Sequence, residues 1–153
     1  MVASPAYLAA HPAPQHPDDL AQHDLVTFNF ARHSDSWPFL IGGKRSEFPA
    51  RGRSTVGDGE SARELALAGQ GLTRLSLFHI AHDIAAGRLI PVLEAFNPGD
   101  VEEIHVVYVG HGGRLPARVR AFIDFLVEEV DLRSFAKPLA TAAAEPAREA
   151  ASV

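Results

Sequence analysis

Histidines beside acidic residues are the first groups in this sequence that could do chemistry. His79, His82 and Asp83 are spaced i, i+3 and i+4, so one face of a helix could present all three to a metal ion. This spacing without a further anchored ligand is a weak zinc signal, and a pair of surface histidines is the favoured interpretation. His105 lies in an apolar run and is interpreted as a satisfied core or cleft residue. The sequence therefore indicates no metal site and no cofactor.

Covalent catalysis needs a nucleophile, and the sequence offers none in a recognisable setting. There is no cysteine, which excludes disulfides, thiolate zinc sites and cysteine nucleophiles. The segment GHGG at residues 110–113 has the composition of an oxyanion loop, but no G-x-S-x-G motif supplies a serine. The paired glutamates at 102–103 and 128–129 are expected in a loop and on a solvated helix face. The chain is predicted not to be an enzyme.

The glycine-bounded stretch STVGDGESARELALAGQGLTRLSLF, residues 54–78, predicts strand, tight turn, helix, tight turn and strand. It has neither the G-x-G-x-x-G register of a dinucleotide-binding turn nor the G-K-[ST] of a P-loop. Asp58 or Gly59 is the expected N-cap of the helix, with Glu60 and Ser61 after it. A second interpretation stays open beside capping: free N–H groups at this helix start could face a cleft and hold a carboxylate or similar anion.

The bulk composition is that of one globular domain. The chain has 153 residues, 46% hydrophobic and 22% charged, with a net charge of −5, which argues against direct contact with DNA. The densest basic patch, KRSEFPARGR at 44–53, is interpreted as the solvated face of a hairpin. No apolar run reaches the length of about 18 residues that a membrane helix needs. The first residues lack the pattern of a secretory signal, so a cytoplasmic location is expected.

Strand and helix patterns alternate along the chain, which predicts an α/β layered fold. Strands are expected at 2–3, 25–30, 54–56, in 88–96, at 103–110 (buried on both faces) and in two short runs around Gly42-Gly43. Helices are expected after Ser4 as N-cap, from Pro17, within 59–68, in 77–87 and in 115–130. The last helix carries an apolar stripe formed by Val119, Phe122, Ile123, Leu126 and Val130.

Several of these segments, taken in order, resemble one protein family, the LysR-type transcriptional regulators. Residues 2–30 resemble the stretch that leads into the second half of the family's effector domain. Residues 56–96 resemble its Asn-Asp-Gly-Glu helix, its Gly-x-Gly turn and the run Leu-Pro…Ala…Gly-x-Leu-x-x-Val-Leu. Residues 114–129, RLPARVRAFIDFLVEE, resemble its closing helix, so the resemblance covers roughly residues 2–131.

The resemblance implies a type 2 periplasmic-binding-protein-like α/β fold, in which two subdomains enclose a small-molecule cleft. Residues 1–102 would be near-complete subdomain 2, and residues 103–133 the return strand and closing helix of subdomain 1. Residues 134–153 would be a disordered Ala/Pro-rich tail. In the family the rest of subdomain 1 and a winged helix-turn-helix precede these segments, so the chain is expected to correspond to the C-terminal half of a regulator, without its DNA-binding part.

The resemblance also implies which residues bind the effector. They share a position at the end of a strand or the start of a helix: Thr27, Phe28, Asn29, Phe30, Gly57, Asp58, Gly59, Ser76 and Phe78. Two positions depart from the family pattern. Gly57 stands where the family usually has asparagine, and Ser76 falls near its common Leu-Pro.

The function implied is effector sensing, with ligand binding between two subdomains altering the geometry of a DNA-bound oligomer. The partners implied are a small-molecule effector, such as an organic anion, and a homo-oligomer or a full-length regulator, with no direct DNA contact and no membrane. The alternative is a stand-alone truncated protein that associates with full-length regulators. On either reading we expect an exposed apolar patch that drives self-association or partial disorder near the C-terminal end, and weak effector binding by a half-cleft.

Overall fold

The computed structural model describes residues 1–29, 36–101, 103–108 and 115–131. The chain divides into two compact units, Met1–Ile104 (unit 1) and His105–Val153 (unit 2). In the described parts of the chain, no helix is both long enough and apolar enough to span a membrane.

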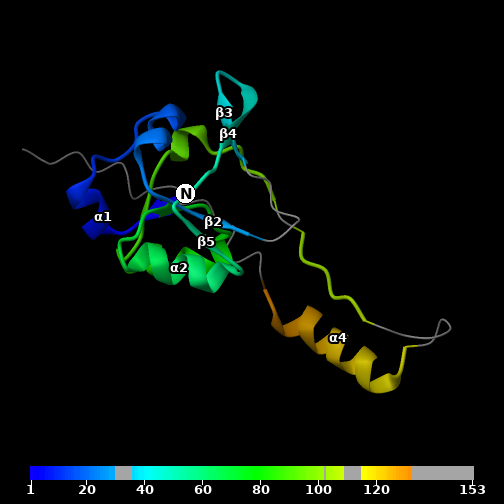
Figure 1. Cartoon of the computed structure of the whole chain (residues 1–153). Coiled ribbons are helices and arrows are strands. Elements are labelled where there is room, and N and C mark those ends of the chain that lie inside the picture. The colour runs from blue at the N-terminus through cyan, green and yellow to red at the C-terminus, as the bar shows by residue number, and fades with distance from the viewer. Residues whose placement is uncertain (30–35, 102, 109–114, 132–153) are drawn as a thin grey trace, which may run out of the picture. The chain divides into compact units, whose positions relative to one another are not determined.

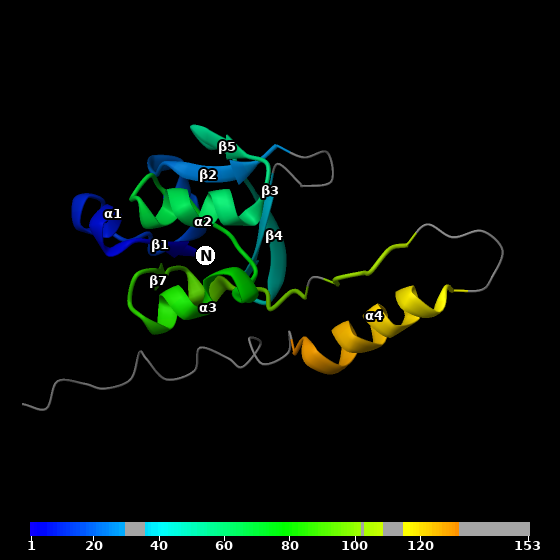
Figure 2. The same cartoon turned by 90° about the horizontal axis from the view of Figure 1, so that it is seen from below.

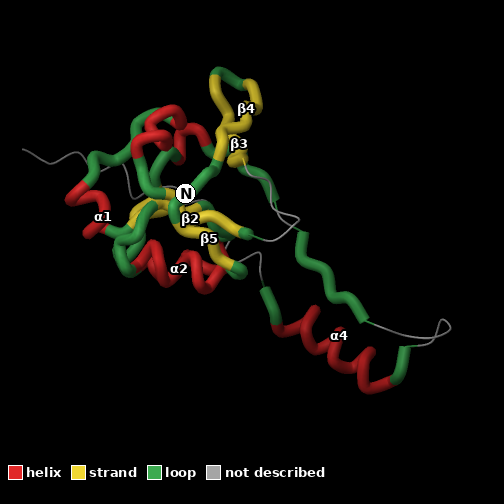
Figure 3. The backbone as a smooth tube through the Cα atoms, in the orientation of Figure 1, coloured by secondary structure: helices red, strands yellow, loops and turns green. Residues whose placement is uncertain are grey.

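A mixed five-stranded sheet organises unit 1, in the order β5-β2-β6-β1-β7. Its neighbouring strands β2 and β5 are labelled in Figures 1 and 3. Its strands are β1 (Val2–Ala3), β2 (Leu25–Phe28), β5 (Ser54–Val56), β6 (Leu72–Thr73) and β7 (Ile90–Pro91). Strand β2 pairs in parallel with both β5 and β6, whereas β1 is antiparallel to β6 and β7. Three parallel strands therefore end at the same edge of the sheet.

The helices of unit 1 begin in different ways, some with a side-chain cap and some without. They are α1 (Pro5–Ala10), η1 (Pro17–Gln22), α2 (Gly59–Leu67), α3 (Leu77–Ala85) and η2 (Glu94–Phe96), with η1 and η2 of the 3₁₀ type. The Ser4 hydroxyl accepts a hydrogen bond from the Tyr7 N–H at 3.3 Å, which confirms the predicted cap of α1. At η1, the Asp19 carboxylate accepts from the N–H groups of Gln15 and His16.

Two apolar clusters cover the two faces of the sheet. Val2 packs with Ala66, Ile80 and Leu89 beneath α2 and α3, which lie side by side (Figure 2). Ala3, the next residue of β1, belongs to the other cluster, because successive side chains of a strand point to opposite faces. That cluster comprises Ala3, Tyr7, Leu20, Leu25, Trp37, Phe39, Ala50, Leu72, Val92 and Leu93.

The predicted hairpin is a separate two-stranded sheet, β3 (Ser36–Ile41) paired with β4 (Lys44–Pro49). Gly42 and Gly43 have φ of 56° and 78°. A two-residue turn with both residues at positive φ matches the twist of the strands, and glycine adopts it at little cost. Most side chains of β4 are exposed, so the basic patch lies on a solvated hairpin as predicted.

One predicted strand is shorter in the structure than expected, and another is absent from its described part. The strand expected within 88–96 is reduced to β7, because Pro91 lacks a donor and Leu93 at φ 59° turns the chain into η2. The strand expected at 103–110 is absent from its described part, residues 103–108, where side chains are exposed. A strand needs a neighbour to pair with, and the strands of both sheets lie between residues 2 and 91. His105 is accordingly exposed and is not a core residue.

In unit 2 the described helix is α4 (Ala117–Glu129), as predicted. Its apolar side chains face solvent to a large degree: Phe122 is 59% exposed and Phe125 is 55% exposed. The predicted exposed apolar patch is therefore present on this helix. The Ala/Pro-rich tail predicted at 134–153 lies outside the described residues.

Candidate functional site

The carboxyl ends of β5, β2 and β6 bring together segments that are far apart in the sequence. Phe28 is opposite Val56 across the β2–β5 pair, and Val26 is opposite Thr73 across the β2–β6 pair. The Asn29 N–H donates to the Val56 carbonyl at 3.0 Å, just past the ends of both strands. In open α/β sheets, ligands bind outside the carboxyl ends of the strands. We call this region the carboxyl edge and define it as residues 27–29, 57–59 and 76–79.

The β2 side of the carboxyl edge contains one buried and one exposed polar side chain. Thr27 is buried, and its hydroxyl donates to the Ser54 carbonyl at 3.5 Å, so this side chain supports the sheet. Asn29 is exposed, and a Cβ on Gly57 would lie at an ordinary 3.9 Å from Asn29 Oδ1. The space at Gly57 therefore admits a Cβ atom. Phe28 is half-buried, and Phe30 lies outside the described residues.

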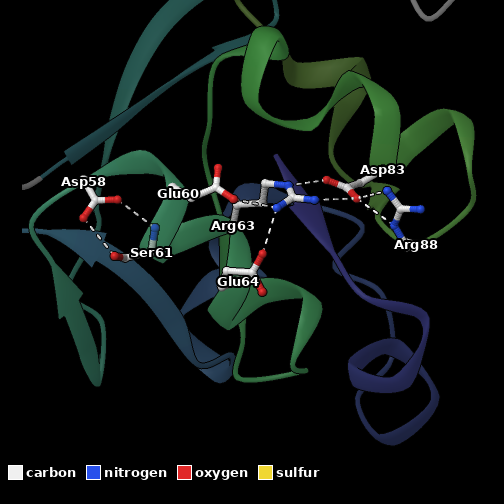
Figure 4. Close-up of polar contacts among 7 residues, drawn as sticks. All are labelled: Asp58, Glu60, Ser61, Arg63, Glu64, Asp83 and Arg88. Carbon is white, nitrogen blue, oxygen red and sulfur yellow. Dashed lines mark hydrogen bonds and ion pairs between the residues drawn. The ribbon is translucent and has the colours of Figure 1, made fainter.

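The α2 start is capped by Asp58, which confirms the capping interpretation. Its carboxylate accepts from the Ser61 N–H and from the Ser61 hydroxyl, both at 2.8 Å (Figure 4). These hydrogen bonds hold the pKa of the Asp58 carboxyl below its ordinary value. The exposed side chain is therefore a fixed negative charge on the carboxyl edge. The alternative role of this helix start, holding a ligand anion, stays a prediction.

The α3 start supplies an aromatic side chain and an imidazole. Ser76 is the N-cap residue; its side chain makes no capping hydrogen bond, and its carbonyl accepts from the His79 N–H at 3.1 Å. Phe78 is 37% exposed, and its ring lies against the His79 ring with centroids 4.1 Å apart. A Cβ on Gly59 would overlap the His79 imidazole, so this ring covers the first residue of α2.

An ion-pair cluster behind the carboxyl edge was not predicted from the sequence. The fully buried Asp83 carboxylate receives Arg63 Nε at 2.5 Å and Nη2 at 3.0 Å, and Arg88 Nε at 2.7 Å (Figure 4). Hydrogen bonds from Arg63, and then from Arg88, keep the pKa of Asp83 below its ordinary value. One signal could have revealed this cluster: Asp83 lies on the apolar side of its helix, between Ile80 and Ile84.

The three residues whose spacing could suit a metal ion have different surroundings in the structure. His79 packs on Gly59, His82 is exposed, and Asp83 is bound by arginines. Across the described ranges, no group of three His, Asp or Glu residues could hold a metal ion.

Two surface hollows lie away from the nine predicted effector residues. One, of about 240 Å³, is lined by Ala13, Pro14, Gln15 and residues 91–96. The other, of about 340 Å³, is polar and is lined by Ser36, Trp37, Pro38, Arg45, Glu47, Arg74 and Asp100. Arg74 directly follows β6, and its guanidinium binds the Asp100 carboxylate at 2.5 Å. Asp100 also lies 4.0 Å from Arg45, so this hollow is lined by a charged network.

Comparison with known proteins assigns the chain to a family. Residues 1–131 match the LysR substrate binding domain. The HTH-type transcriptional regulator CrgA of Neisseria meningitidis is 35% identical over 130 residues, which are 85% of this chain and 43% of CrgA. PtxR of Pseudomonas aeruginosa, also an HTH-type transcriptional regulator, is 31% identical over 134 residues, 88% of this chain and 42% of PtxR. The chain spans less than half the length of these curated relatives.

Solved structures of related regulators share the fold. The CrgA regulatory domain from Neisseria meningitidis aligns with a TM-score of 0.67 and 30% identity, over 85% of this chain and 63% of that chain. The AphB regulatory domain from Vibrio vulnificus aligns with a TM-score of 0.57 and 27% identity, over 83% of this chain and 62% of that chain. The mixed α/β sheet is therefore the periplasmic-binding-protein-like fold of these regulatory domains. Together with the family match, this shows that the chain belongs to the LysR-type transcriptional regulators, a non-enzymatic family, and that residues 1–131 match the substrate-binding domain of that family.

Proposed function

We propose that this chain is the effector-sensing part of a LysR-type transcriptional regulator and that a small molecule binds at the carboxyl edge. The observation that carries the proposal is the parallel alignment of β5, β2 and β6. Because these strands end together, the residues that follow them form one wall on a domain of a ligand-sensing family. Asn29, Gly57 to Gly59, Ser76 and Phe78 supply donors, acceptors and an aromatic surface on that wall.

The proposed cleft forms between two subdomains, with residues 1–102 as subdomain 2 and residues 103–133 as part of subdomain 1. The boundary between the compact units, after Ile104, supports this division. The chain also aligns with only 63% of the CrgA regulatory domain, so the remaining part of such a domain has no counterpart in the aligned region. Ligand binding between the subdomains would alter the geometry of a DNA-bound oligomer.

An organic anion with an apolar body is the proposed effector class. The α2 start carries the Asp58 carboxylate, which repels a second negative charge there. The first turn of α3 contains no acidic residue and has Phe78 and His79 beside it. An anionic group is therefore better placed near the start of α3, with its apolar part on Phe78.

The proposed location is the cytoplasm, and the proposed protein partner is another copy or a full-length regulator. The exposed apolar residues of α4 support the protein partner, since large apolar patches on soluble proteins mark interaction sites. The same residues support the second candidate, an interaction protein that associates with full-length regulators through α4. In neither case does the proposal include direct DNA contact or a membrane.

A thermal-shift screen of the full chain against small organic acids tests the proposal. A ligand present at about ten times its Kd stabilises a protein by about 1.4 kcal/mol, which raises Tm by about 4 °C at this chain length. The shift should disappear in Asn29→Leu and persist in Gln22→Leu, a matched change of an exposed residue on η1. A shift equal in both variants, or none with any acid, would contradict the proposal.

A further inference from the structure

Helices α2 and α3 contact each other through two pairs of residues that have the same spacing on both helices. Gly59 and Arg63 are four residues apart on α2, and His79 and Asp83 are four residues apart on α3, so each pair lies on one helix face. The His79 ring covers Gly59, and the Asp83 carboxylate binds Arg63. The two helices are thus joined by two contacts, one turn apart, which we call the outer contact (Gly59–His79) and the inner contact (Arg63–Asp83).

The inner contact is geometrically specific. Arg63 binds both oxygens of Asp83 through Nε and Nη2, and a bidentate pair fixes orientation as well as distance. Arg63 is held from its other side by Glu60 and Glu64, at 2.7 and 2.8 Å (Figure 4). Buried ion pairs contribute less to net stability than to a defined geometry in several proteins. This arrangement fixes the rotation of α3 against α2.

The outer contact lies on the carboxyl edge, where a ligand would approach. His79 is half-buried, one turn from Asp83 toward the start of α3. Its imidazole ring is tilted by 38° against the ring of the neighbouring Phe78, and among the described residues it makes no side-chain hydrogen bond. The ring therefore offers a hydrogen-bond donor beside an exposed aromatic face, which suits a ligand that joins an apolar body to an acceptor group.

We propose that His79 contacts the effector as a hydrogen-bond donor that selects ligands with a carboxylate or similar acceptor, and that Arg63–Asp83 is the positioning pair that holds His79 at the carboxyl edge. This inference rests on the proposed function and names a recognition residue outside the nine predicted from the sequence. Asp83 does not touch the ligand; it acts by fixing α3.

The first test titrates the full chain with benzoate and with benzyl alcohol, its uncharged analogue, and follows binding by NMR. Benzoate should bind more tightly than the alcohol to the wild-type chain. His79→Ala should weaken benzoate binding about tenfold, as expected for loss of a hydrogen bond to a charged group, and alcohol binding less than about twofold. His79→Gln, which keeps a donor, should retain most of the benzoate affinity.

Unchanged benzoate affinity in His79→Ala overturns the role of His79 and leaves the proposed function intact. No saturable binding by the wild-type chain would count against both.

The second test separates positioning from stability, using histidine ring signals of the labelled chain. Asp83→Asn should move the His79 signals and lower benzoate affinity several-fold, whereas Glu64→Gln, which removes a more exposed partner of Arg63, should change neither. Gly59→Ala should move His79 through the outer contact without touching the ion pair, and so covers the case in which Asp83→Asn does not fold. His79 signals that stay unmoved in Gly59→Ala and in folded Asp83→Asn would overturn the positioning role.

Discussion

Helices α3 and α4 both carry apolar side chains, but these have very different surroundings. On α3, Ile80 is 2% exposed and the charged Asp83 is fully buried, whereas on α4 the apolar Phe122 is 59% exposed. A carboxylate thus lies deeper than a phenylalanine in the same chain. The periodicity of a stripe determines which side of a helix is apolar, but burial also requires a partner surface. For α3 that surface is α2 with β1, and for Asp83 it is a pair of arginines.

The largest expected effect is at Asp83, because its removal breaks the inner contact. Asp83→Ala should lower the free energy of unfolding by about 3 kcal/mol, since it leaves Arg63 and Arg88 without their buried counter-charge. The measurement is urea unfolding followed by circular dichroism. Asp124→Ala on α4 is the control, where an exposed position predicts a change below about 0.5 kcal/mol. Equal effects at the two positions would show that burial of Asp83 does not matter to the fold.

Three glycines of unit 1 should differ in the stability that is lost when each is replaced by alanine. Gly71 has φ 149°, and a Cβ there would overlap the Asp24 carbonyl oxygen, so Gly71→Ala should cost about 2 kcal/mol. Gly87 has φ 68° with open space around it, so Gly87→Ala should cost about 1 kcal/mol for the left-handed backbone alone. Gly59→Ala should be within about 0.5 kcal/mol of wild type, because only a flexible imidazole must move. The same unfolding experiment ranks them, and a Gly59 cost above that of Gly71 would be inconsistent with the structure.

The pH dependence of unit 1 should carry a contribution from His23, which lies at the end of the sheet opposite the carboxyl edge. The Tyr7 hydroxyl accepts from the Asp24 N–H at 3.0 Å and lies 3.1 Å from His23 Nδ1. The Tyr7 hydroxyl can therefore donate its proton to His23 Nδ1 only when the His23 ring is neutral. Burial, and then the charge of His11, lower the pKa of His23 below its ordinary value of 6.5.

Because the folded chain binds this proton less readily than the unfolded chain, the His23 contribution to stability is complete above pH 6.5 and falls as the pH drops toward the folded pKa. Wild type should therefore lose stability between pH 7 and pH 5 more steeply than His23→Gln. Unfolding free energies at a series of pH values give the two slopes. Equal slopes would show that His23 does not contribute to the pH dependence of stability.

The smallest expected effect on stability is at the exposed stripe of α4. Phe122→Ser should change the free energy of unfolding by less than about 0.5 kcal/mol, because its side chain is already largely in water. The same change should reduce self-association, measured by sedimentation velocity over a range of concentrations. A loss of stability above about 1.5 kcal/mol would mean that Phe122 is buried in solution by a surface of its own chain.

Features with a local cause could be predicted from the sequence. The Ser4 cap, the Asp58 cap and the Gly42-Gly43 turn depend on a few neighbouring residues, and the structure has all three. Features that depend on distant partners could not be predicted. Asp83 meets Arg63 across twenty residues, and residues 103–108 have the composition of a buried strand without one in the described structure.

The carboxyl edge lies between these two cases. Its segments were identified from a family resemblance, and their assembly follows from the parallel pairing of β2 with β5 and β6, which no local signal specifies. The contact of His79 with Gly59 could not be predicted, because it arises only when α2 and α3 pack together.

Effector sensing at the carboxyl edge is tested most directly by a residue-resolved map of amide chemical shifts while the full chain is titrated with benzoate. We expect the largest changes at Asn29, at Gly57 to Gly59 and at Ser76 to His79, with Arg63 and Asp83 affected less. Changes centred instead on the hollow beside Pro14, Leu93 and Phe96, with the carboxyl edge unmoved, would contradict the claim that this edge is where the chain senses its effector.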